Sequence, residues 1–337
     1  MILEATTPNR VDLAGGTLDI FPLYIFEEFG LTINMAVDLT SQVWLEETDE
    51  KKIVIHSKDL GLTAGAPTAS ELPLDGPLSF VARVIRFYNP PPGWKIATQN
   101  NVRKGSGLGA SSALLIALSG ALNHIGGKKY SPMEIIDIGA NLEAQSIGTM
   151  TGKQDYFPAM FGGLSAIWFD VTGAKREELV SDASLLEELN KRLVLTFAGE
   201  PRFSGLTNWA MVKNYLDGNQ KTVSKMHTIK ETALEMYEAL KKGDLDGFGQ
   251  TLRKEWENRR DLAEGVTNET IDRMVEDARQ AGAIASKICG AGGGGCMITF
   301  VKPGKREAVI ESLVNAGAQL MDYRISSRGL TIETKSD

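Results

Sequence analysis

Residues 104–112 are the part of the sequence whose residue types most clearly suggest chemistry. They read Lys104, Gly105, Ser106, Gly107, Leu108, Gly109, Ala110, Ser111 and Ser112, and an apolar, alanine-rich segment follows. Glycines let the backbone turn tightly, and a helix that starts directly afterwards adds the positive end of its dipole. The stretch therefore predicts a site for the phosphates of a nucleotide, although a loop that only caps a core helix has the same local pattern.

Two acidic residues are candidates for a role beside this loop. Asp155 lies in a polar segment with Lys153 and Gln154. A carboxylate there could accept or orient a hydroxyl proton, and the neighbouring cation would stabilise its ionised form. Glu143, on an apolar helical segment, could bind Mg²⁺ with a loop serine, because Mg²⁺ needs few protein ligands besides phosphate oxygens and water. Taken alone, both acids also fit a surface ion pair and a solvated helix end.

A third candidate region is the turn in residues 10–19, where a strand ends in glycines followed by a threonine and an aspartate. Such a turn is either a plain hairpin connection or a place where a ligand meets backbone. A second glycine run occupies residues 290–295. Phosphoryl transfer needs a phosphate cradle, a divalent cation, positive charge and a group that orients the acceptor hydroxyl. The sequence offers a candidate for each requirement.

Hydrophobic periodicity supplies the elements that must position these residues. Strands are expected at 32–37, 42–45, 52–56, 94–98, 163–169, 192–197 and 297–301, and two more near the C-terminus. Helices are expected at 77–88, after the glycine loop, at 131–147 behind the cap Ser131, and at 305–317. Residues 62–76 are expected to form a loop, and residues 206–277 to be mainly helical with a break at Gly243. This mixture predicts an α+β protein.

Composition excludes several other classes of protein. With 337 residues, 42% of them hydrophobic, the chain can bury one large core or two ordinary ones. A net charge of -7 argues against nucleic acid as a partner. The two cysteines, Cys289 and Cys296, suggest no disulfide framework, and the three histidines lack zinc-site spacing. Without a signal peptide or membrane-spanning stretch, we expect a cytoplasmic protein whose oligomeric state stays open.

Three separated stretches resemble the signature motifs of the GHMP superfamily, which comprises galactokinase, homoserine kinase, mevalonate kinase and phosphomevalonate kinase. They lie at residues 7–19, 105–113 and 287–295, in the order and spacing of that superfamily. Within it the chain is most similar to sugar kinases of the heptose 7-phosphate kinase type, with fucokinase domains nearby. Residues 152–155, 161–163 and 256–263, with Arg202 and Ser204, carry this second resemblance.

The resemblance implies ATP- and Mg²⁺-dependent phosphorylation of a sugar or sugar phosphate, often at the anomeric hydroxyl. It implies an N-terminal domain like domain 2 of ribosomal protein S5 (residues 1–190) and a ferredoxin-like C-terminal domain (residues 191–337). By position, Asp155, Arg10 and Lys153 are expected to be catalytic, and Ser111 and Glu143 to bind the metal. Residues 104–112 are expected to bind ATP, and the sugar is expected at Gly16, Thr17, Asp19, Tyr156, Arg202, Gly292 and Gly293.

Departures from the family pattern concern the substrate. Tyr156 stands where heptose kinases usually have Gln, and Thr17-Leu18 replaces the more usual Gly-Thr before Asp19. If the substrate carries a phosphate, Arg202 or Lys153 is the cation expected to bind it. A dinucleotide-binding oxidoreductase is disfavoured, because residues 126–130 form a loop where that fold needs a strand and an acidic residue. A catalytically silent sugar and nucleotide sensor, or a kinase of a non-sugar alcohol, are the remaining alternatives.

Overall fold

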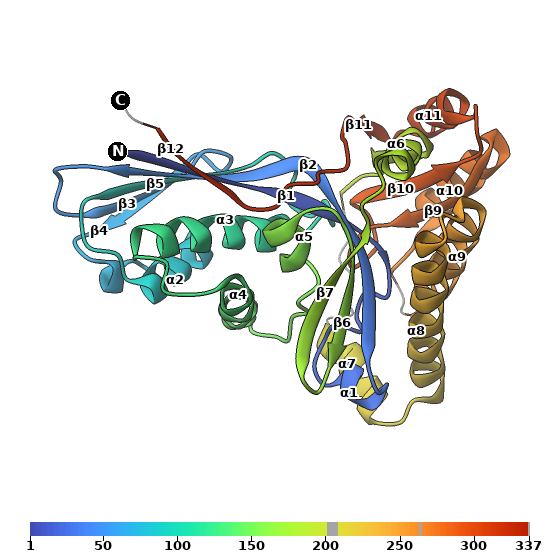
Figure 1. Cartoon of the computed structure of the whole chain (residues 1–337), viewed down its shortest axis with the longest axis horizontal. Coiled ribbons are helices and arrows are strands. Elements are labelled where there is room, and N and C mark those ends of the chain that lie inside the picture. Colours follow the sequence, from blue (N-terminus) through green and yellow to red (C-terminus); the bar gives the residue numbers. More distant parts are fainter. Residues whose placement is uncertain (201–207, 263–264, 336–337) are drawn as a thin grey trace.

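The computed structural model describes residues 1–200, 208–262 and 265–335, which form two β-sheets with helices packed on them (Figure 1). The first sheet contains β1 (Ile2–Ala14), β2 (Gly30–Glu47), β3 (Ile53–Ser57), β4 (Leu62–Ala66), β5 (Trp94–Asn100), β6 (Leu164–Asp170), β7 (Gly173–Val180) and β12 (Thr331–Lys335). The second contains β8 (Leu193–Phe197), β9 (Ala283–Ile288), β10 (Cys296–Val301) and β11 (Gln319–Met321).

Helices cover one face of the first sheet. Its strand order is β12-β1-β2-β5-β3-β4, while β6 pairs with the other half of β2 and β7 pairs with β6. The helices on this face are α2 (Ser79–Tyr88), α3 (Ala110–Ile125), α4 (Pro132–Ile147) and α5 (Tyr156–Phe161) (Figure 1). α3 contacts β1, β2 and β5 as well as the other three helices, and its apolar side chains are almost all buried. The helix that follows the glycine loop is thus fixed in the core.

The second sheet has the order β11-β8-β10-β9 and is antiparallel throughout. The helices on it are α9 (Leu245–Arg259), α10 (Glu269–Ala281) and α11 (Arg306–Asn315). α8 (Gln220–Lys241) lies along α9 and also contacts β2 and β7, so it bridges the two sheets (Figure 1). The remaining helical elements are α1 (Leu23–Phe26), η1 (Ala69–Glu71), α6 (Ala183–Arg192) and α7 (Asn208–Leu216).

The two ends of the chain meet in the first sheet. β12 runs antiparallel to β1, with Ile2 opposite Lys335 (Figure 1). The backbone groups of the last strand therefore complete the edge of the first sheet. The expected boundary near residue 190 falls in the last turn of α6 and stays a prediction.

Most predicted elements are confirmed, and the differences have local causes. Ser131 caps α4 in a full capping box with Glu134, as expected. The two strands expected at 32–37 and 42–45 are one strand, β2, which continues through an irregularity opposite Pro8 and Asn9. The loop expected over residues 62–76 is wrong for β4, an edge strand of small and exposed residues that is held by backbone pairing to β3. Sequence patterns also missed β7, α5 and α6.

No helix among the described residues is long and apolar enough to cross a membrane.

Candidate active site

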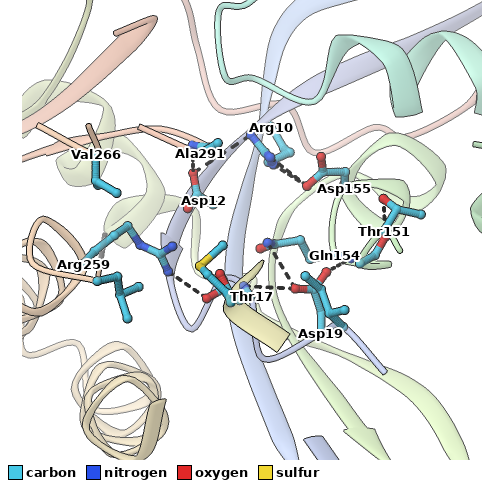
Figure 2. Close-up of a pocket in the computed structure, with 16 residues that line it drawn as sticks. Arg10, Asp12, Thr17, Asp19, Thr151, Gln154, Asp155, Arg259, Val266 and Ala291 are labelled. Atoms are coloured by element: carbon cyan, nitrogen blue, oxygen red, sulfur yellow. Dashed lines mark hydrogen bonds and ion pairs between the residues drawn. The ribbon is translucent and has the colours of Figure 1, made fainter. Parts of the chain in front are cut away.

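A pocket lies between β1 and the turn after it, the segment before α5, the end of α9 and the second glycine run (Figure 2). Its volume of about 190 Å³ is below the roughly 300–1,000 Å³ typical of sites for drug-sized ligands, so it suits a compact molecule. The residues that line it come from distant parts of the chain: Arg10, Asp12, Gly16, Thr17, Asp19, Ile20, Thr151, Gly152, Gln154, Asp155, Met211, Arg259, Leu262, Val266, Gly290 and Ala291.

Asp155 and Arg10 form an ion pair at the inner end of this pocket (Figure 2). Both Nε and Nη2 of Arg10 lie 2.8 Å from Oδ1 of Asp155. Arg10 also donates to the backbone oxygen of Gly107, and its backbone N–H donates to Leu108 O at 2.9 Å. Burial alone would lower the pKa of Arg10, but the carboxylates of Asp155 and Asp12 raise it. Arg10 therefore stays charged and ties β1 to both the pocket and the glycine loop.

Asp19 is a buried carboxylate on the opposite wall. It accepts hydrogen bonds from the backbone N–H of Thr17 at 3.1 Å and of Gln154 at 2.9 Å. Burial raises the pKa of Asp19 to about 6, with the charge of Asp155 adding to the rise and the Gln154 N–H opposing it. Near neutral pH the Asp19 carboxylate is thus mostly ionised. It lines the pocket, where it can accept a hydrogen bond from a hydroxyl group.

The glycine loop forms a concave backbone turn against the second glycine run. Gly105, Gly107 and Gly109 all adopt the left-handed region, with φ of 78°, 74° and 72°. Alternation of this kind turns successive N–H groups toward one side and creates an anion site. No side chain caps the N-terminus of α3, so its first N–H groups keep their capacity to bind an anion.

Close packing holds the loop in this shape. A Cβ on Gly107 would lie 2.3 Å from the carbonyl oxygen of Cys289, and one on Gly295 would lie 2.7 Å from Gly105 O. The backbone N–H of Cys296 donates to Ser106 O at 2.7 Å. The two glycine-rich motifs are therefore one structural unit, which the sequence alone did not show.

Glu143 lies beside the loop serines and has the donor atoms that a magnesium site requires. Ser112 Oγ donates to Glu143 Oε2 at 3.1 Å, and Tyr156 OH donates to the same carboxylate oxygen. Burial raises the pKa of Glu143, although hydrogen bonds from Tyr156, Ser111 and Ser112 counteract the rise. One carboxylate and a hydroxyl suit Mg²⁺, which takes its other ligands from phosphate and water. The described residues contain no cluster of three His, Cys, Asp or Glu side chains that would favour another metal.

A second buried ion pair joins the two sheets behind the pocket. Lys287 Nζ of β9 lies 2.6 Å from Asp12 Oδ2 of β1, and both side chains are buried. Asp12 Oδ1 also accepts from Gly290 N–H at 2.8 Å. Burial alone would raise the pKa of Asp12, but the charges of Lys287, Arg10 and Arg259 lower it overall. This pair fixes the second glycine run against the pocket wall.

The structure brings most of the expected site residues together, but not all of them. Tyr156 is fully buried and touches Glu143 rather than the pocket, because its ring packs in the core around α3. Lys153 Nζ pairs with Asp137 at 2.6 Å, outside the pocket wall. Gly292 and Gly293 pack against Val266, whose carbonyl accepts from Gly293 N–H. These positions do not support the expected sugar contacts or a catalytic lysine.

Arg202 lies outside the described residues. Sequence reasoning also missed pocket residues, namely Asp12, Gln154, Arg259, Gly290 and Ala291. Asp12 could have been found from its place two residues after Arg10, because alternate residues of a strand share a face. Gln154 is adjacent to Asp155, and Arg259 lies in a stretch that carried the family resemblance. Gly290 and Ala291 belong to the second glycine run, which the sequence marked without assigning it to this pocket.

Family models match two parts of the chain. The model described as the GHMP kinases N-terminal domain matches residues 78–163, and the one described as GHMP kinases C terminal matches residues 236–319. The chain is 30% identical over 336 residues to a D-glycero-alpha-D-manno-heptose 7-phosphate kinase of Campylobacter jejuni, which covers 97% of this chain and 98% of the relative. It is 27% identical to a galactokinase of Thermotoga neapolitana, over 93% of each chain.

Solved structures agree with this relationship. A D-glycero-D-manno-heptose 1-phosphate kinase of Bacteroides thetaiotaomicron superposes with a TM-score of 0.81 at 27% identity, over 99% of this chain and 100% of the other. A galactokinase of Lactococcus lactis, solved with galactose, shares the fold with a TM-score of 0.80 at 20% identity, over 98% and 95% of the two chains. The predicted mixed α+β fold is confirmed, as is the predicted enzyme class, a phosphotransferase with an alcohol acceptor. The chain belongs to the GHMP kinase family.

Proposed function

We propose that this kinase transfers the terminal phosphoryl group of ATP to a hydroxyl of a sugar or sugar phosphate, with the anomeric hydroxyl as the first acceptor to test. The observation that carries the proposal is the position of Asp155. Its side chain lines the pocket, and its carboxyl group would lie only 3.3 Å from a Cβ on Gly109 of the glycine loop. One carboxylate thus contacts both the acceptor pocket and the turn that precedes α3.

In this proposal Asp155 accepts the proton of the attacking hydroxyl. Arg10 holds the carboxylate through two nitrogen atoms, so the second oxygen, Oδ2, can face the acceptor. The guanidinium also adds positive charge where negative charge builds up on the transferred group. Lys153, which pairs with Asp137, has no part in this proposal.

The glycine loop and the N-terminus of α3 are proposed to bind the phosphates of ATP through backbone N–H groups. Glu143 and the loop serines, with Ser111 exposed at the start of α3, are proposed to hold Mg²⁺. When bound, the ion would neutralise phosphate charge during transfer. In this proposal the Tyr156 hydroxyl orients the Glu143 carboxylate through a hydrogen bond. Tyr156 would thus act at the metal site and not at the sugar.

A sugar is the acceptor best supported by the pocket and by the relatives. Asp19 offers an acceptor for hydroxyl hydrogens, and Gln154 offers a neighbouring donor. The relatives include a heptose 7-phosphate kinase and a galactokinase. The cationic side chains that line the described part of the pocket, Arg10 and Arg259, are both paired with carboxylates.

The test is an ATP-dependent turnover screen with D-glycero-D-manno-heptose 7-phosphate, galactose, fucose and mevalonate, followed by phosphorus NMR of the product. We expect turnover with at least one sugar and a new phosphate ester signal. Turnover with mevalonate alone would show that the acceptor is not a sugar. Binding of a sugar and ATP without any turnover would favour the sensor alternative.

The role of Asp155 is tested with Asp155→Asn. Loss of a positioned proton acceptor should lower kcat by about 10²–10⁴-fold while ATP affinity stays nearly unchanged. Asp137→Asn is the matched control, because Asp137 is an exposed aspartate that pairs with Lys153. An equal loss of kcat and ATP affinity in Asp155→Asn would indicate a structural role instead.

A further inference from the structure

The side-chain amide of Gln154 lies between two buried polar groups. Its Oε1 accepts from Asn34 Nδ2 at 3.3 Å, and its Nε2 donates to Asp19 Oδ1 at 3.4 Å. Its backbone N–H donates to the other oxygen of Asp19 at 2.9 Å. Gln154 lines the pocket, and Figure 2 shows its amide directed toward Asp19. The residue therefore fixes the Asp19 carboxylate twice.

Asn34 holds the end of this amide that faces away from Asp19. It projects from β2, is fully buried, and is absent from the pocket wall. Because the Asp19 carboxylate can only accept, the nitrogen of Gln154 faces Asp19 and its oxygen faces Asn34. The Nδ2 of Asn34 donates to this oxygen and to Thr32 Oγ1 at 3.1 Å. A residue outside the pocket wall thus holds the amide of one that lines the pocket.

The Gly16 backbone leaves room for this amide. A Cβ on Gly16 would lie 3.1 Å from both Gln154 Nε2 and Arg259 Nη2. Gly15 needs its left-handed φ of 79°, whereas the backbone of Gly16 is outside that region. Space, not backbone conformation, therefore favours glycine at position 16. Any side chain there would displace two nitrogen donors from the pocket wall.

We propose that Gln154 is a specificity-determining residue that, together with Asp19, recognises one hydroxyl group of the acceptor, and that Asn34 is its positioning residue. A hydroxyl both donates and accepts, so it can donate to the Asp19 carboxylate and accept from the second hydrogen of Gln154 Nε2. Among the described residues, Gln154 Nε2 donates one hydrogen bond, to Asp19, which leaves its second hydrogen for a ligand. This inference rests on the proposed function, because it assumes a hydroxylated acceptor in this pocket.

The pair should reject an acceptor that lacks the recognised hydroxyl. A site built to hydrogen-bond a hydroxyl leaves its own buried polar groups unpaired when the hydroxyl is missing. The wild-type enzyme should therefore discriminate strongly against one monodeoxy analogue of its sugar. Gln154→Met, which keeps the length of the side chain but not its amide, should lose most of this discrimination at the same position.

The test is a double-mutant cycle of Asn34→Ala and Gln154→Met, assayed with the panel sugar that the wild type turns over best. We expect KM for the sugar to rise about tenfold in Gln154→Met and several-fold in Asn34→Ala, with KM for ATP unchanged in both. In the double variant the Asn34 substitution should add nothing, because its effect passes through Gln154. Additive effects, or equal changes in both KM values, would overturn the inference.

Asn101→Ala is the matched control, since Asn101 also donates to side chains of β2 but is exposed and does not line the pocket. Its sugar KM should equal that of the wild type.

A second measurement needs no sugar. In the ¹⁵N NMR spectrum of the full chain, Asp19→Asn should shift the side-chain amide signal of Gln154. The shift should shrink in the Asn34→Ala background, and a shift of equal size there would overturn the role of Asn34. If the wild type turns over no sugar, the proposed function fails, while the NMR experiment still decides the orientation of Gln154.

Discussion

The proposed nucleotide side and the proposed acceptor side of the site are built in different ways. The glycine loop of residues 104–112 is continuous in sequence, and its shape comes from backbone conformation and close backbone packing. The acceptor pocket gathers residues from β1 and the turn after it, the segment before α5, α9 and the second glycine run, which hydrogen bonds hold in place. A site built from backbone groups suits the nucleotide phosphates, which stay the same from one kinase to another. A site built from a network of side chains can change with the acceptor molecule.

The two sides meet at Arg10 and Asp155. Arg10 donates to the glycine loop through Gly107 O and to the pocket through Asp155. A substitution on one side should therefore change one binding constant and leave the other intact, unless it reaches this pair.

Gly107→Ala should have the largest effect, and only on the nucleotide side. The new methyl group would meet the carbonyl oxygen of Cys289 at a left-handed φ of 74°. We expect KM for ATP to rise and unfolding free energy to fall by roughly 1–3 kcal/mol. Gly127→Ala is the control, because its φ of 84° has the same strain but no atom lies within 4 Å of the added Cβ. Equal ATP binding in both variants would contradict the packing argument.

Glu143→Gln should raise the Mg²⁺ concentration needed for half-maximal activity by roughly 10- to 100-fold. The amide keeps the size of the side chain but removes the negative charge of the carboxylate, which is proposed to bind the ion together with Ser111 and Ser112. Sugar KM at saturating Mg²⁺ should not move. A metal titration that matches the wild type would show that Glu143 is not a ligand.

Acceptor binding should depend on pH through Asp19. Since the pKa of Asp19 is about 6, sugar affinity should fall about tenfold for each pH unit below that value, as the carboxylate takes up a proton. Calorimetric titration of the sugar between pH 4.5 and 7.5 measures this slope. Asp19→Asn should flatten the profile, and a profile that keeps its slope would assign the titration to another group.

The same pKa predicts the opposite trend for stability without ligands. In the folded protein Asp19 takes up a proton at about pH 6. An aspartate in an unfolded chain does so only at about pH 3.9. The contribution of this residue to the unfolding free energy therefore rises as pH falls from about 6 to 4. Comparing the pH dependence of denaturant midpoints for wild type and Asp19→Asn isolates it.

Tyr156→Phe should have a smaller effect on the nucleotide side. It removes one hydrogen bond to the Glu143 carboxylate and keeps the buried ring. A single hydrogen bond contributes about 0.5–1.5 kcal/mol net, so the Mg²⁺ requirement should rise about tenfold at most, with sugar KM unchanged. A selective rise in sugar KM would instead restore the expected contact between Tyr156 and the sugar.

Lys153→Met should have the smallest effect. Its ion pair with Asp137 is largely exposed, and such pairs contribute roughly 0–1 kcal/mol. We expect kcat and both KM values to stay within about twofold of the wild type. A large loss of kcat would show that Lys153 leaves Asp137 and acts in catalysis.

The sequence by itself determined the nucleotide side. Glycines with positive φ, a following apolar helix and the capping box at Ser131 are local features, so local residue types predict them. The family resemblance added Asp155, Arg10, Glu143 and Asp19, and the structure places Asp155, Arg10 and Asp19 on the pocket wall and Glu143 beside the loop.

Only the tertiary structure decided the acceptor side. Asn34 and Gln154 are 120 residues apart, and Lys287 reaches Asp12 across 275 positions. No residue pattern specifies such contacts, because they depend on how segments that are far apart in the sequence pack together. The same packing buried Tyr156 and turned Lys153 toward Asp137, which local sequence could not predict. Backbone turns follow from the residues that form them, whereas a pocket follows from the residues that the fold brings together.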